Sequence, residues 1–290
     1  MIEIGLCTDQ RYARYCGICI TSIFESNTTH AVRIHILTDG LDKLTRQRLS
    51  ATADRYKQEV VIHTIDTHLI DALRTTDRFS RAAYFRLLFP DVLDRQINKL
   101  LYLDCDLLVV DDLMPLWQTD LQGKAIGMAW DQDADNIIHQ NRLDTALTYA
   151  NSGVLLLNLR RWREEKIAQA CVRYIDTYPE RCLYVDQDAV NGLLYADRVW
   201  FDPRYNLQEL YYFTPQNWQL HRDKHAQIYR ALSQPAIIHY TGMYKPWDRK
   251  CYHPLKEHWH AIEAISLFAE KKDPLRGIKR AIRKLCKKSA

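Results

Sequence analysis

The sequence lacks the features that place a chain inside a membrane or in a secretory pathway. No stretch approaches the ~18 consecutive apolar residues that a membrane-spanning helix requires. Residues 1–6 have neither the basic start nor the long apolar segment of a signal peptide. Internal repeats and low-complexity linkers are also missing. We therefore expect a cytoplasmic chain whose first strand begins at once.

The cysteines do not form a recognisable disulfide or zinc pattern. The eight cysteines are scattered, and most of them lie inside apolar segments, as small core residues do. Cys16 and Cys19 have the spacing of half a zinc site or of a redox pair, but no second such pair follows. We expect reduced thiols, which are usual in the cytosol.

The net charge of +4 conceals an uneven distribution. Residues 271–290 contain nine basic residues and one acidic residue, a net charge of about +8, which leaves about −4 on residues 1–270. A nucleic-acid-binding protein needs a basic face on its folded body. The sequence therefore does not predict a nucleic acid as partner.

Strand-like and helix-like segments alternate at short intervals, which is typical of an α/β fold with a largely parallel sheet. We expect strands over residues 2–7, 32–37, 60–65, 125–130, 154–158 and 236–240, and helices over residues 12–25, 41–56, 80–89, 162–178 and 186–195. Pro90 is expected to end the helix before it. The simplest partition is one catalytic domain over residues 1–260 and a C-terminal tail over residues 261–290.

Residues 99–110 contain the strongest signal for chemistry. An apolar run of strand length leads to Asp104 and Asp106, and the chain then becomes apolar again. In an extended backbone these two side chains project from one side, because side chains alternate across a strand. Two carboxylates held together at the carboxyl end of a buried strand repel each other. The pair therefore indicates a bound cation, and we expect a divalent ion that carries a diphosphate.

His239 extends this signal, because it also ends an apolar strand. A lone histidine there is more often a core residue with its hydrogen bonds satisfied. Two carboxylates and an imidazole, however, suit Mn²⁺ better than Mg²⁺ or Ca²⁺. Such an ion acts as a Lewis acid on phosphate oxygens and stabilises a diphosphate leaving group.

Four motifs in the same order give the chain a resemblance to a known family. They are Leu101-Tyr102-Leu103-Asp104-x-Asp106, Asn151-x-Gly153-Val154-Leu155, Asp186-Gln187-Asp188-x-x-x-Asn191-Gly192 and His239-Tyr240-x-Gly242-x-x-Lys245-Pro246-Trp247. With them the chain resembles the retaining glycosyltransferases of family 8, especially the bacterial lipooligosaccharide galactosyl- and glucosyltransferases. The resemblance implies a single GT-A domain, Rossmann-like with a mixed and mostly parallel sheet, and a nucleotide-diphosphate sugar donor, usually with UDP.

The resemblance also implies roles for individual residues. Mn²⁺, with Mg²⁺ as the alternative ion, would be held by Asp104, Asp106 and His239. The donor would be bound by these three residues and by Cys7, Thr8, Asp9, Tyr12, Arg86, Cys105, Asn151, Asp186, Gln187, Gly242 and Lys245. Within this set, residues 7–9 and Tyr12 belong beside the base, and Gly242 and Lys245 beside the diphosphate.

The catalytic residues implied by the resemblance are Asp131, Asp186 and Gln187, which would line the sugar and acceptor side. An ionised Asp186 suits the recognition of sugar hydroxyls. An amide is a poor nucleophile, so we prefer a front-face displacement to a covalent intermediate on Gln187. The aromatic residues over 200–218, with Tyr184 nearby, form either an acceptor wall or a packed irregular core. Asp188 is either a site residue or a helix cap.

Two other classes of protein remain alternatives. A phosphohydrolase of the haloacid dehalogenase type also has an apolar strand followed by Asp-x-Asp, but it has Thr or Val where Leu108 stands. A non-catalytic protein that binds sugars at a membrane surface is the second alternative. Mn²⁺-dependent hydrolysis of a UDP-sugar that is lost in Asp104→Asn distinguishes the transferase from the sugar-binding protein.

The tail separates apolar and basic residues on a helical wheel. Leu275, Ile278, Ala281, Ile282 and Leu285 lie on one arc, and basic residues occupy the other. This pattern is typical of a helix that lies in an anionic membrane surface, although a solvated, frayed terminus is the alternative. We expect a protein peripheral to the inner face of the cell membrane, with a lipid-anchored saccharide acceptor.

Overall fold

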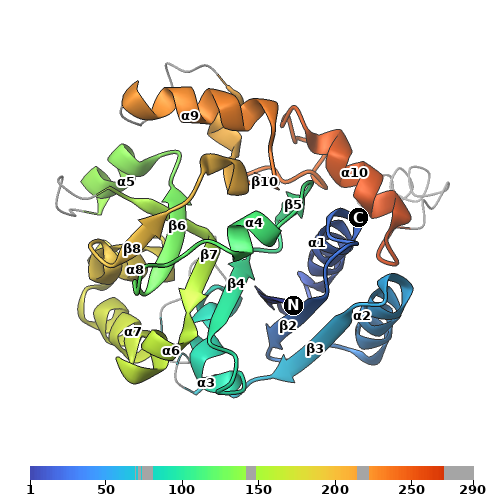
Figure 1. Ribbon diagram of the computed structural model, residues 1–290, viewed down its shortest axis with the longest axis horizontal. Coiled ribbons are helices and arrows are strands. Elements are labelled where there is room, and N and C mark those ends of the chain that lie inside the picture. Colours follow the sequence, from blue (N-terminus) through green and yellow to red (C-terminus); the bar gives the residue numbers. More distant parts are fainter. Residues whose placement is uncertain (69, 71–72, 74–80, 142–147, 214–221, 271–290) are drawn as a thin grey trace, which may run out of the picture.

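The computed structural model describes residues 1–68, 70, 73, 81–141, 148–213 and 222–270. Its centre is a seven-stranded sheet with the strand order β3-β2-β1-β4-β7-β6-β8 (Figure 1). These strands are β1 (Ile2–Cys7), β2 (Val32–Thr38), β3 (Glu59–Thr64), β4 (Lys99–Leu103), β6 (Ile126–Trp130), β7 (Ala150–Asn158) and β8 (Arg198–Trp200). β7 is antiparallel to β4 and to β6, and the other neighbours are parallel. The predicted mixed and mostly parallel α/β architecture is confirmed.

A second sheet lies beside the first and has the strand order β5-β10-β9. Its strands are β5 (Leu107–Val109), β9 (Leu207–Gln208) and β10 (Ile237–His239). β10 runs antiparallel to β5 and parallel to β9. This small sheet joins three segments that are far apart in the sequence. β10 ends at His239, and β5 begins directly after Asp106, so the sheet adjoins the expected metal site.

Helices cover both faces of the central sheet. The longer ones are α1 (Ala13–Ser26), α2 (Lys43–Tyr56), α7 (Ile167–Thr177), α8 (Asp186–Leu194), α9 (Arg222–Ser233) and α10 (Lys256–Ile265). The shorter ones are η1 (Arg81–Leu88), α3 (Phe89–Val92), α4 (Met114–Trp117), α5 (Ala134–Gln140), α6 (Leu159–Glu164), η2 (Pro179–Arg181), η3 (Pro203–Tyr205) and η4 (Glu209–Tyr212).

The two faces of the sheet bury separate apolar clusters. Alternate residues of β1 and β2, such as Ile4 and Ile34, pack with α1 and α10 on one face. On the other face Leu37 and Leu100 pack with η1, α3 and the helices α6 to α8. Full burial of such a side chain stabilises the fold by about 1.5–3 kcal/mol. These clusters hold the strand ends that carry the polar residues described below.

Several boundaries differ from those expected from the sequence. Pro90 does not end a helix, because it lies in the first turn of α3, where a missing N–H costs nothing. The expected helix 162–178 is divided into α6 and α7 by Lys166, whose φ is +52°. β7 starts at Ala150 and includes the Asn151-x-Gly153 motif instead of following it. Ser80, the expected first residue of the helix that ends before Pro90, lies outside the described residues.

The last described residues, up to Glu270, pack against α1 and form ion pairs with it. α10 spans residue 260, the boundary between domain and tail that is expected from the sequence. Trp259 and Phe268 are both buried. Arg14 donates from Nε to the carbonyl of Phe268 at 3.1 Å and forms ion pairs with Glu263 and Glu270. Residues 271–290, including the expected amphipathic helix, lie outside the described part of the chain.

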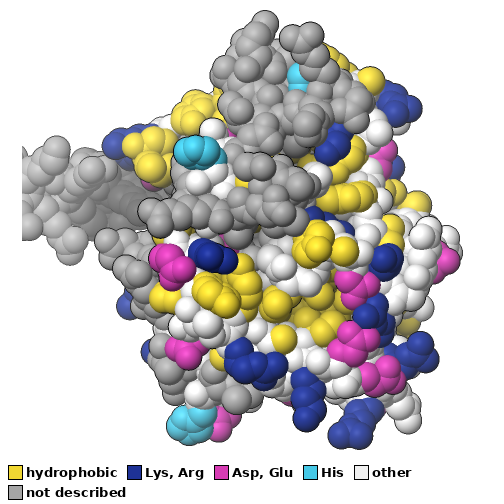
Figure 2. Space-filling model, turned by 90° about the vertical axis from the view of Figure 1, so that its left-hand side faces the viewer, with side chains coloured by type: hydrophobic (Ala, Val, Ile, Leu, Met, Phe, Trp, Pro, Cys, Tyr) yellow, Lys and Arg dark blue, Asp and Glu magenta, His cyan; other side chains and the backbone are white. Residues whose placement is uncertain are grey.

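Some of the exposed large hydrophobic side chains lie in two regions, and the others, such as Met243 and Tyr252, lie elsewhere. Around α7 and α8 they are Tyr178, Leu183, Leu193 and Tyr195. Near the end of α10 they are Ile265 and Leu267. Figure 2 shows the left-hand side of the view in Figure 1, where hydrophobic side chains lie among charged ones. None of the described helices combines the length and the apolar character that crossing a membrane requires.

Candidate metal and nucleotide-sugar site

The acidic pair lies in a turn between two strands rather than within one strand. β4 ends at Leu103 and β5 begins at Leu107, so Asp104 and Asp106 occupy the connection between the two sheets. The expectation that both side chains project from an extended strand is therefore wrong. The backbone N–H of Asp104 donates to the carbonyl of Gly153 at 2.8 Å, which holds the turn against β7. The pair still projects beyond the carboxyl end of β4.

The pairing of β10 with β5 brings His239 to this turn. His239 pairs with Leu107, the residue that directly follows Asp106. The amide N–H of Tyr240 donates to the carbonyl of Asp106 at 3.0 Å. An antiparallel register thus places a residue from late in the chain beside the acidic pair.

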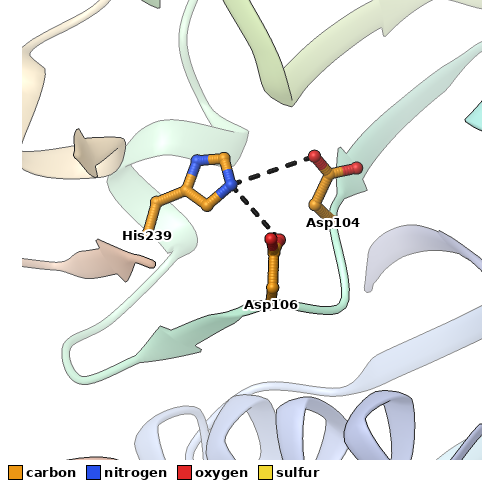
Figure 3. A group of neighbouring side chains, drawn as sticks. All are labelled: Asp104, Asp106 and His239. Atoms are coloured by element: carbon orange, nitrogen blue, oxygen red, sulfur yellow. Dashed lines mark ion pairs between the residues drawn. The ribbon is translucent and has the colours of Figure 1, made fainter. Parts of the chain in front are cut away.

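The three side chains point toward one common centre (Figure 3). Nε2 of His239 lies 3.3 Å from Oδ1 of Asp106 and 3.9 Å from Oδ2 of Asp104. One ligand atom from each residue fits within 4.8 Å of the other two. Within the described residues, no other group of three His, Cys, Asp or Glu side chains has this geometry. Two carboxylate oxygens and an imidazole nitrogen are a set of ligand atoms that can hold a divalent metal ion.

Gly153 makes room for this group. A Cβ atom on Gly153 would lie 2.1 Å from Cε1 of His239 and 2.9 Å from Oδ2 of Asp104. Real Cβ atoms essentially never come so close to another heavy atom. The glycine of the Asn151-x-Gly153 motif therefore allows the imidazole to pack directly against β7.

Lys245 is the nearest cation to the acidic pair in the described structure. Its Nζ lies 2.7 Å from Oδ2 of Asp106 and 2.6 Å from the carbonyl oxygen of Tyr240. Burial disfavours the ionised form of Asp106, but the ammonium group and the contact with His239 outweigh it, so the pKa of Asp106 lies far below its ordinary value. Trp247 stacks on Tyr15 of α1 with ring centroids 3.7 Å apart, which anchors the segment that carries Lys245.

Arg86 connects the metal side of the site with the sugar side. Its buried guanidinium lies 3.3 Å from Oδ1 of Asp104 and 3.0 Å from Oδ2 of Asp186, and it donates to the carbonyl of Ser152 at 2.6 Å. Tyr102 donates from its hydroxyl to Oδ1 of Asp104 at 2.6 Å and lies below the guanidinium. Arg86 thus balances two carboxylates from different elements.

Asp186 is the least satisfied carboxylate of the site. It is 1% exposed, and neither oxygen receives a hydrogen bond of good geometry, although Arg86 lies close. Burial raises the pKa of Asp186 to about 6, against the opposing charge of Arg86. Beyond its ion pair with Arg86, the carboxylate keeps unused capacity to accept hydrogen bonds, and sugar hydroxyls are donors.

A bulge in β7 creates the polar centre of the site. Gly127 of β6 pairs with Leu156, but Ala129 pairs with Asn151, so Met128 alone lies opposite residues 152–155 of β7. Such a bulge frees backbone groups from the ladder. The freed N–H of Ser152 donates to Oε1 of Gln187 at 2.9 Å.

Gln187, Asn151 and Asp131 are joined by their side chains. Oε1 of Gln187 also accepts from the hydroxyl of Ser152 at 3.2 Å and from Nδ2 of Asn151 at 3.4 Å. Oδ2 of Asp131 accepts from Nδ2 of Asn151 at 3.0 Å and from Nε2 of Gln187 at 3.3 Å. Burial raises the pKa of Asp131, which these hydrogen bonds partly offset. All three expected sugar-side residues are therefore brought together with Asp186.

The residues expected beside the nucleotide base lie at the carboxyl end of β1. Cys7 ends this strand, and its carbonyl accepts from Sγ of Cys105 at 3.2 Å. Thr8 continues from the strand and donates its N–H to the carbonyl of Leu37. Oδ1 of Asp9 accepts from the N–H of Tyr12 at 2.8 Å, which shapes the start of α1. Because β1 and β4 are parallel neighbours, this segment lies next to the acidic turn.

Gly242 lies beside the side chain of Glu209. Its N–H donates to Oε2 of Glu209 at 3.0 Å, and a Cβ atom on Gly242 would lie 1.9 Å from that oxygen. The space beside Gly242 is filled by a buried carboxylate in the described structure. A diphosphate can approach this N–H only when the side chain of Glu209 moves.

Burial and hydrogen bonding bear on two of the open alternatives. Tyr205 and Tyr211 are buried in the core, so the irregular aromatic segment is a packed core at these positions, and Trp218 lies outside the described residues. Asp188 does not face the metal group. It accepts hydrogen bonds from the N–H of Tyr184, from Asn141 and from Tyr149, so it holds the start of α8 in place. Burial raises the pKa of Asp188 to about 6.

Cys16 and Cys19 are free thiols buried in α1, as expected for core residues.

Sequence reasoning missed Ser152, Asn206 and Glu209. Ser152 stands in a motif that was recognised, whereas Asn206 and Glu209 belong to an irregular segment without a periodic pattern. Asn206 is fully buried and hydrogen bonded to His239.

Comparison with known proteins gives a consistent result. The model of glycosyl transferase family 8 matches residues 3–251. General stress protein A of Bacillus subtilis is 26% identical over 266 residues, which cover 89% of this chain and 92% of that protein. Lipopolysaccharide 1,2-glucosyltransferase of Escherichia coli K12 is 28% identical over 258 residues, covering 87% of this chain and 75% of that enzyme.

The fold comparison agrees with the sequence comparison. The crystal structure of the galactosyltransferase LgtC, in complex with donor and acceptor sugar analogs, superposes with a TM-score of 0.83 at 26% identity. The match covers 95% of this chain and 99% of that chain. The family model spans the acidic turn, the β7 motif, the start of α8 and His239. The chain therefore belongs to glycosyl transferase family 8 and has the GT-A fold of a glycosyltransferase.

Proposed function

We propose that this protein transfers a hexose, glucose or galactose, from a UDP-sugar to a saccharide of the lipopolysaccharide core, with retention of the anomeric configuration. The observation that carries the proposal is the convergence of Asp104, Asp106 and His239 beside the polar centre around Gln187. Support for the sugar classes comes from relatives named as lipopolysaccharide glucosyl- and galactosyltransferases and from LgtC.

We propose Mn²⁺ as the ion, because two carboxylates and an imidazole suit it as ligands. When bound, it would stabilise the negative charge that develops on the diphosphate as the sugar leaves. Lys245 lies close enough to add a second positive charge on the same group. Arg86, held between Asp104 and Asp186, would orient the sugar relative to the phosphate. The unsatisfied carboxylate of Asp186 would accept hydrogen bonds from sugar hydroxyls.

The hydrogen bonds of Gln187 support front-face displacement. Its amide oxygen already accepts from the N–H and hydroxyl of Ser152 and from Asn151. An amide oxygen is a weak nucleophile, and three donors withdraw its lone pairs further. In our proposal Gln187 therefore positions the sugar, and the leaving phosphate takes the proton of the acceptor hydroxyl.

Neither of the two alternative functions has support. The family match and the named relatives are those of glycosyltransferases, not of phosphohydrolases. Relatives named for an activity are glucosyl- and galactosyltransferases, not non-catalytic sugar-binding proteins. We therefore retain the transferase alone.

The decisive experiment is a screen of UDP-sugars for hydrolysis and transfer, with Mn²⁺, with Mg²⁺ and with a chelator. We expect one UDP-hexose to be consumed in a metal-dependent reaction, and Asp104→Asn to lower the rate at least 10²-fold. Asp112→Asn, which removes an acidic side chain outside the site, is the matched control and is expected to retain activity. Product analysis by NMR then gives the anomeric configuration. Hydrolysis that persists with chelator, or an Asp104→Asn enzyme of full activity, would refute the proposal.

We further propose that residues 271–290 bind an anionic membrane surface at the inner face of the cell membrane and bring the enzyme to a lipid-anchored acceptor. Support comes from the charge of about +8 in this tail and from the separation of apolar and basic residues on a helical wheel. The exposed Ile265 and Leu267 precede the tail directly.

A further inference from the structure

Asn206 is a fully buried asparagine that connects the metal group with the sugar side. It follows η3 and directly precedes β9, the strand that pairs with β10. Its Oδ1 lies 2.8 Å from Nδ1 of His239, and its Nδ2 donates to Oδ1 of Asn151 at 2.9 Å. No solvent replaces these partners, because Asn206 has no exposed surface.

The orientation of the Asn151 amide is fixed by a backbone group. The N–H of Gly153 lies 2.9 Å from Oδ1 of Asn151, and a backbone N–H can only donate. The oxygen of Asn151 must therefore face Gly153 and Asn206, and its NH₂ group must face Asp131. The contact of Nδ2 with the carboxylate of Asp131 at 3.0 Å agrees with this orientation at the opposite end.

The direction of the remaining hydrogen bonds follows from this orientation. Since Oδ1 of Asn151 is an acceptor, Asn206 must direct its NH₂ group toward it. The oxygen of Asn206 then faces His239, so Nδ1 of His239 must carry a proton and donate it. Nε2, the other ring nitrogen, is left facing Asp104 and Asp106.

The opposite arrangement leaves buried groups unpaired. If Nδ1 of His239 carried no proton, Asn206 would have to present its NH₂ group there and its oxygen to Oδ1 of Asn151. Two acceptors would then face each other in a dry interior. Buried polar groups without partners are strongly disfavoured, so the described orientation is retained.

We propose that Asn206 is a positioning residue, which fixes the ring of His239 with Nδ1 protonated so that Nε2 is presented to the metal ion. The inference rests on the proposed function, because it takes the Asp104, Asp106 and His239 group to be the metal site. A metal ion binds the nitrogen that has no proton, and the hydrogen bond of the other nitrogen selects which one this is. Asn206 also ties that ligand through Asn151 to Asp131 on the sugar side.

The first test is NMR of the full chain labelled with ¹⁵N-histidine, with His239 assigned by comparison with His239→Gln. We expect a proton on Nδ1 of His239 both in metal-free protein and with Mg²⁺ as a diamagnetic ion, whatever Nε2 carries. A neutral ring with the proton on Nε2 would overturn the proposal. This measurement needs no metal, so it tests the role of Asn206 even if the proposed metal site is wrong.

The second test measures Mn²⁺ affinity by electron paramagnetic resonance in the absence of nucleotide. Asn206→Leu removes the acceptor for Nδ1, and we expect its Mn²⁺ affinity to fall about 10–100-fold, with the histidine proton moving toward Nε2. Asn206→Asp restores an acceptor, so it should keep the Nδ1 proton and bind Mn²⁺ more tightly than Asn206→Leu.

The matched control is Asn27→Leu. Asn27 is another buried asparagine, whose side chain hydrogen bonds with the backbone of Ile23 and Leu113. It should lose thermal stability without losing Mn²⁺ affinity. If Asn206→Leu binds Mn²⁺ as the wild type does, or if Asn206→Asp is no better than Asn206→Leu, Asn206 does not position His239. Absence of Mn²⁺ binding in the wild type would instead refute the proposed metal site.

Discussion

The ammonium group of Lys245 lies 2.7 Å from Oδ2 of Asp106, one of the three expected metal ligands. Lys245 also donates to the carbonyl of Tyr240, so its position is fixed at two points. A cation in this place neutralises part of the acidic pair before any metal arrives. We therefore expect metal binding to compete with Lys245 for Asp106, and the ammonium group to become available to the diphosphate.

Lys245→Met tests this competition. We expect Mn²⁺ alone to bind about three- to tenfold more tightly, because a neighbouring positive charge has been removed from the ligand. UDP in the presence of Mn²⁺ should bind more weakly, because the diphosphate loses a cation. Both affinities are measured by isothermal titration calorimetry. Lys250→Met, which removes an exposed lysine above the ring of Tyr244, should change neither affinity. Unchanged Mn²⁺ affinity in Lys245→Met would show that the two cations do not compete.

Gly153→Ala tests the close packing of His239 against β7. The new methyl group would lie 2.1 Å from Cε1 of His239, so the imidazole must shift from its position beside the acidic pair. We expect Mn²⁺ affinity to fall at least about tenfold, as when a group that orients a ligand is lost. Electron paramagnetic resonance measures this directly.

The control for Gly153→Ala is Gly17→Ala. Its methyl group would meet the ring of Phe268 at 2.3 Å, a similar overlap outside the site. We expect a lower melting temperature with Mn²⁺ affinity unchanged. Equal loss of affinity in the two variants would mean that general destabilisation, not the position of His239, is responsible.

Asp186→Asn tests the pH dependence that burial gives to Asp186. Its pKa is about 6 in the folded chain against 3.8 for an ordinary Asp, so the folded state binds the proton more tightly. Between these two values the unfolded state has lost the proton and the folded state has not. The contribution of Asp186 to the free energy of unfolding therefore falls as pH rises from about 4 to about 6, by about 2–3 kcal/mol, and is constant above that.

The asparagine variant has no such proton to lose. Relative to wild type, Asp186→Asn should gain stability between pH 4 and pH 7, measured by urea unfolding at several pH values, whatever constant cost it has beside Arg86. Asp176→Asn, at an exposed position of α7, should keep the wild-type slope. A stability difference between Asp186→Asn and wild type that does not change with pH would contradict the raised pKa.

The sequence predicted the metal group because its signals are local. Asp104 and Asp106 stand one residue apart after an apolar strand, and His239 ends another such strand. What local patterns do not contain is the register of β10 against β5, which places His239 beside Leu107. That register depends on packing between segments far apart in the chain. For this reason the sequence alone could suggest the three ligands but could not place them together.

Asn206 and Glu209 were beyond prediction for a related reason. An amide or an acid in an irregular segment is usually exposed, and only the tertiary structure shows that both are buried. The break at Lys166 was equally hidden, because a single left-handed residue leaves the hydrophobic periodicity of α6 and α7 nearly intact. Hydrophobic patterns thus predicted the elements, whereas the buried polar contacts required the structure.

The tail is tested by deletion and by charge. The described chain up to Glu270 is held to α1 by Arg14, so removal of residues 271–290 should leave the fold and UDP-sugar hydrolysis unchanged. Binding to vesicles that contain anionic lipid should weaken strongly, since each basic residue near such a surface contributes about 1 kcal/mol. Replacement of the basic residues of 271–290 by Gln, with the apolar residues kept, separates charge from apolar insertion. Vesicle sedimentation at low and high salt measures both variants, with neutral vesicles as the control. If the truncated chain binds the vesicles as strongly as the wild type does, residues 271–290 are not the membrane-binding segment.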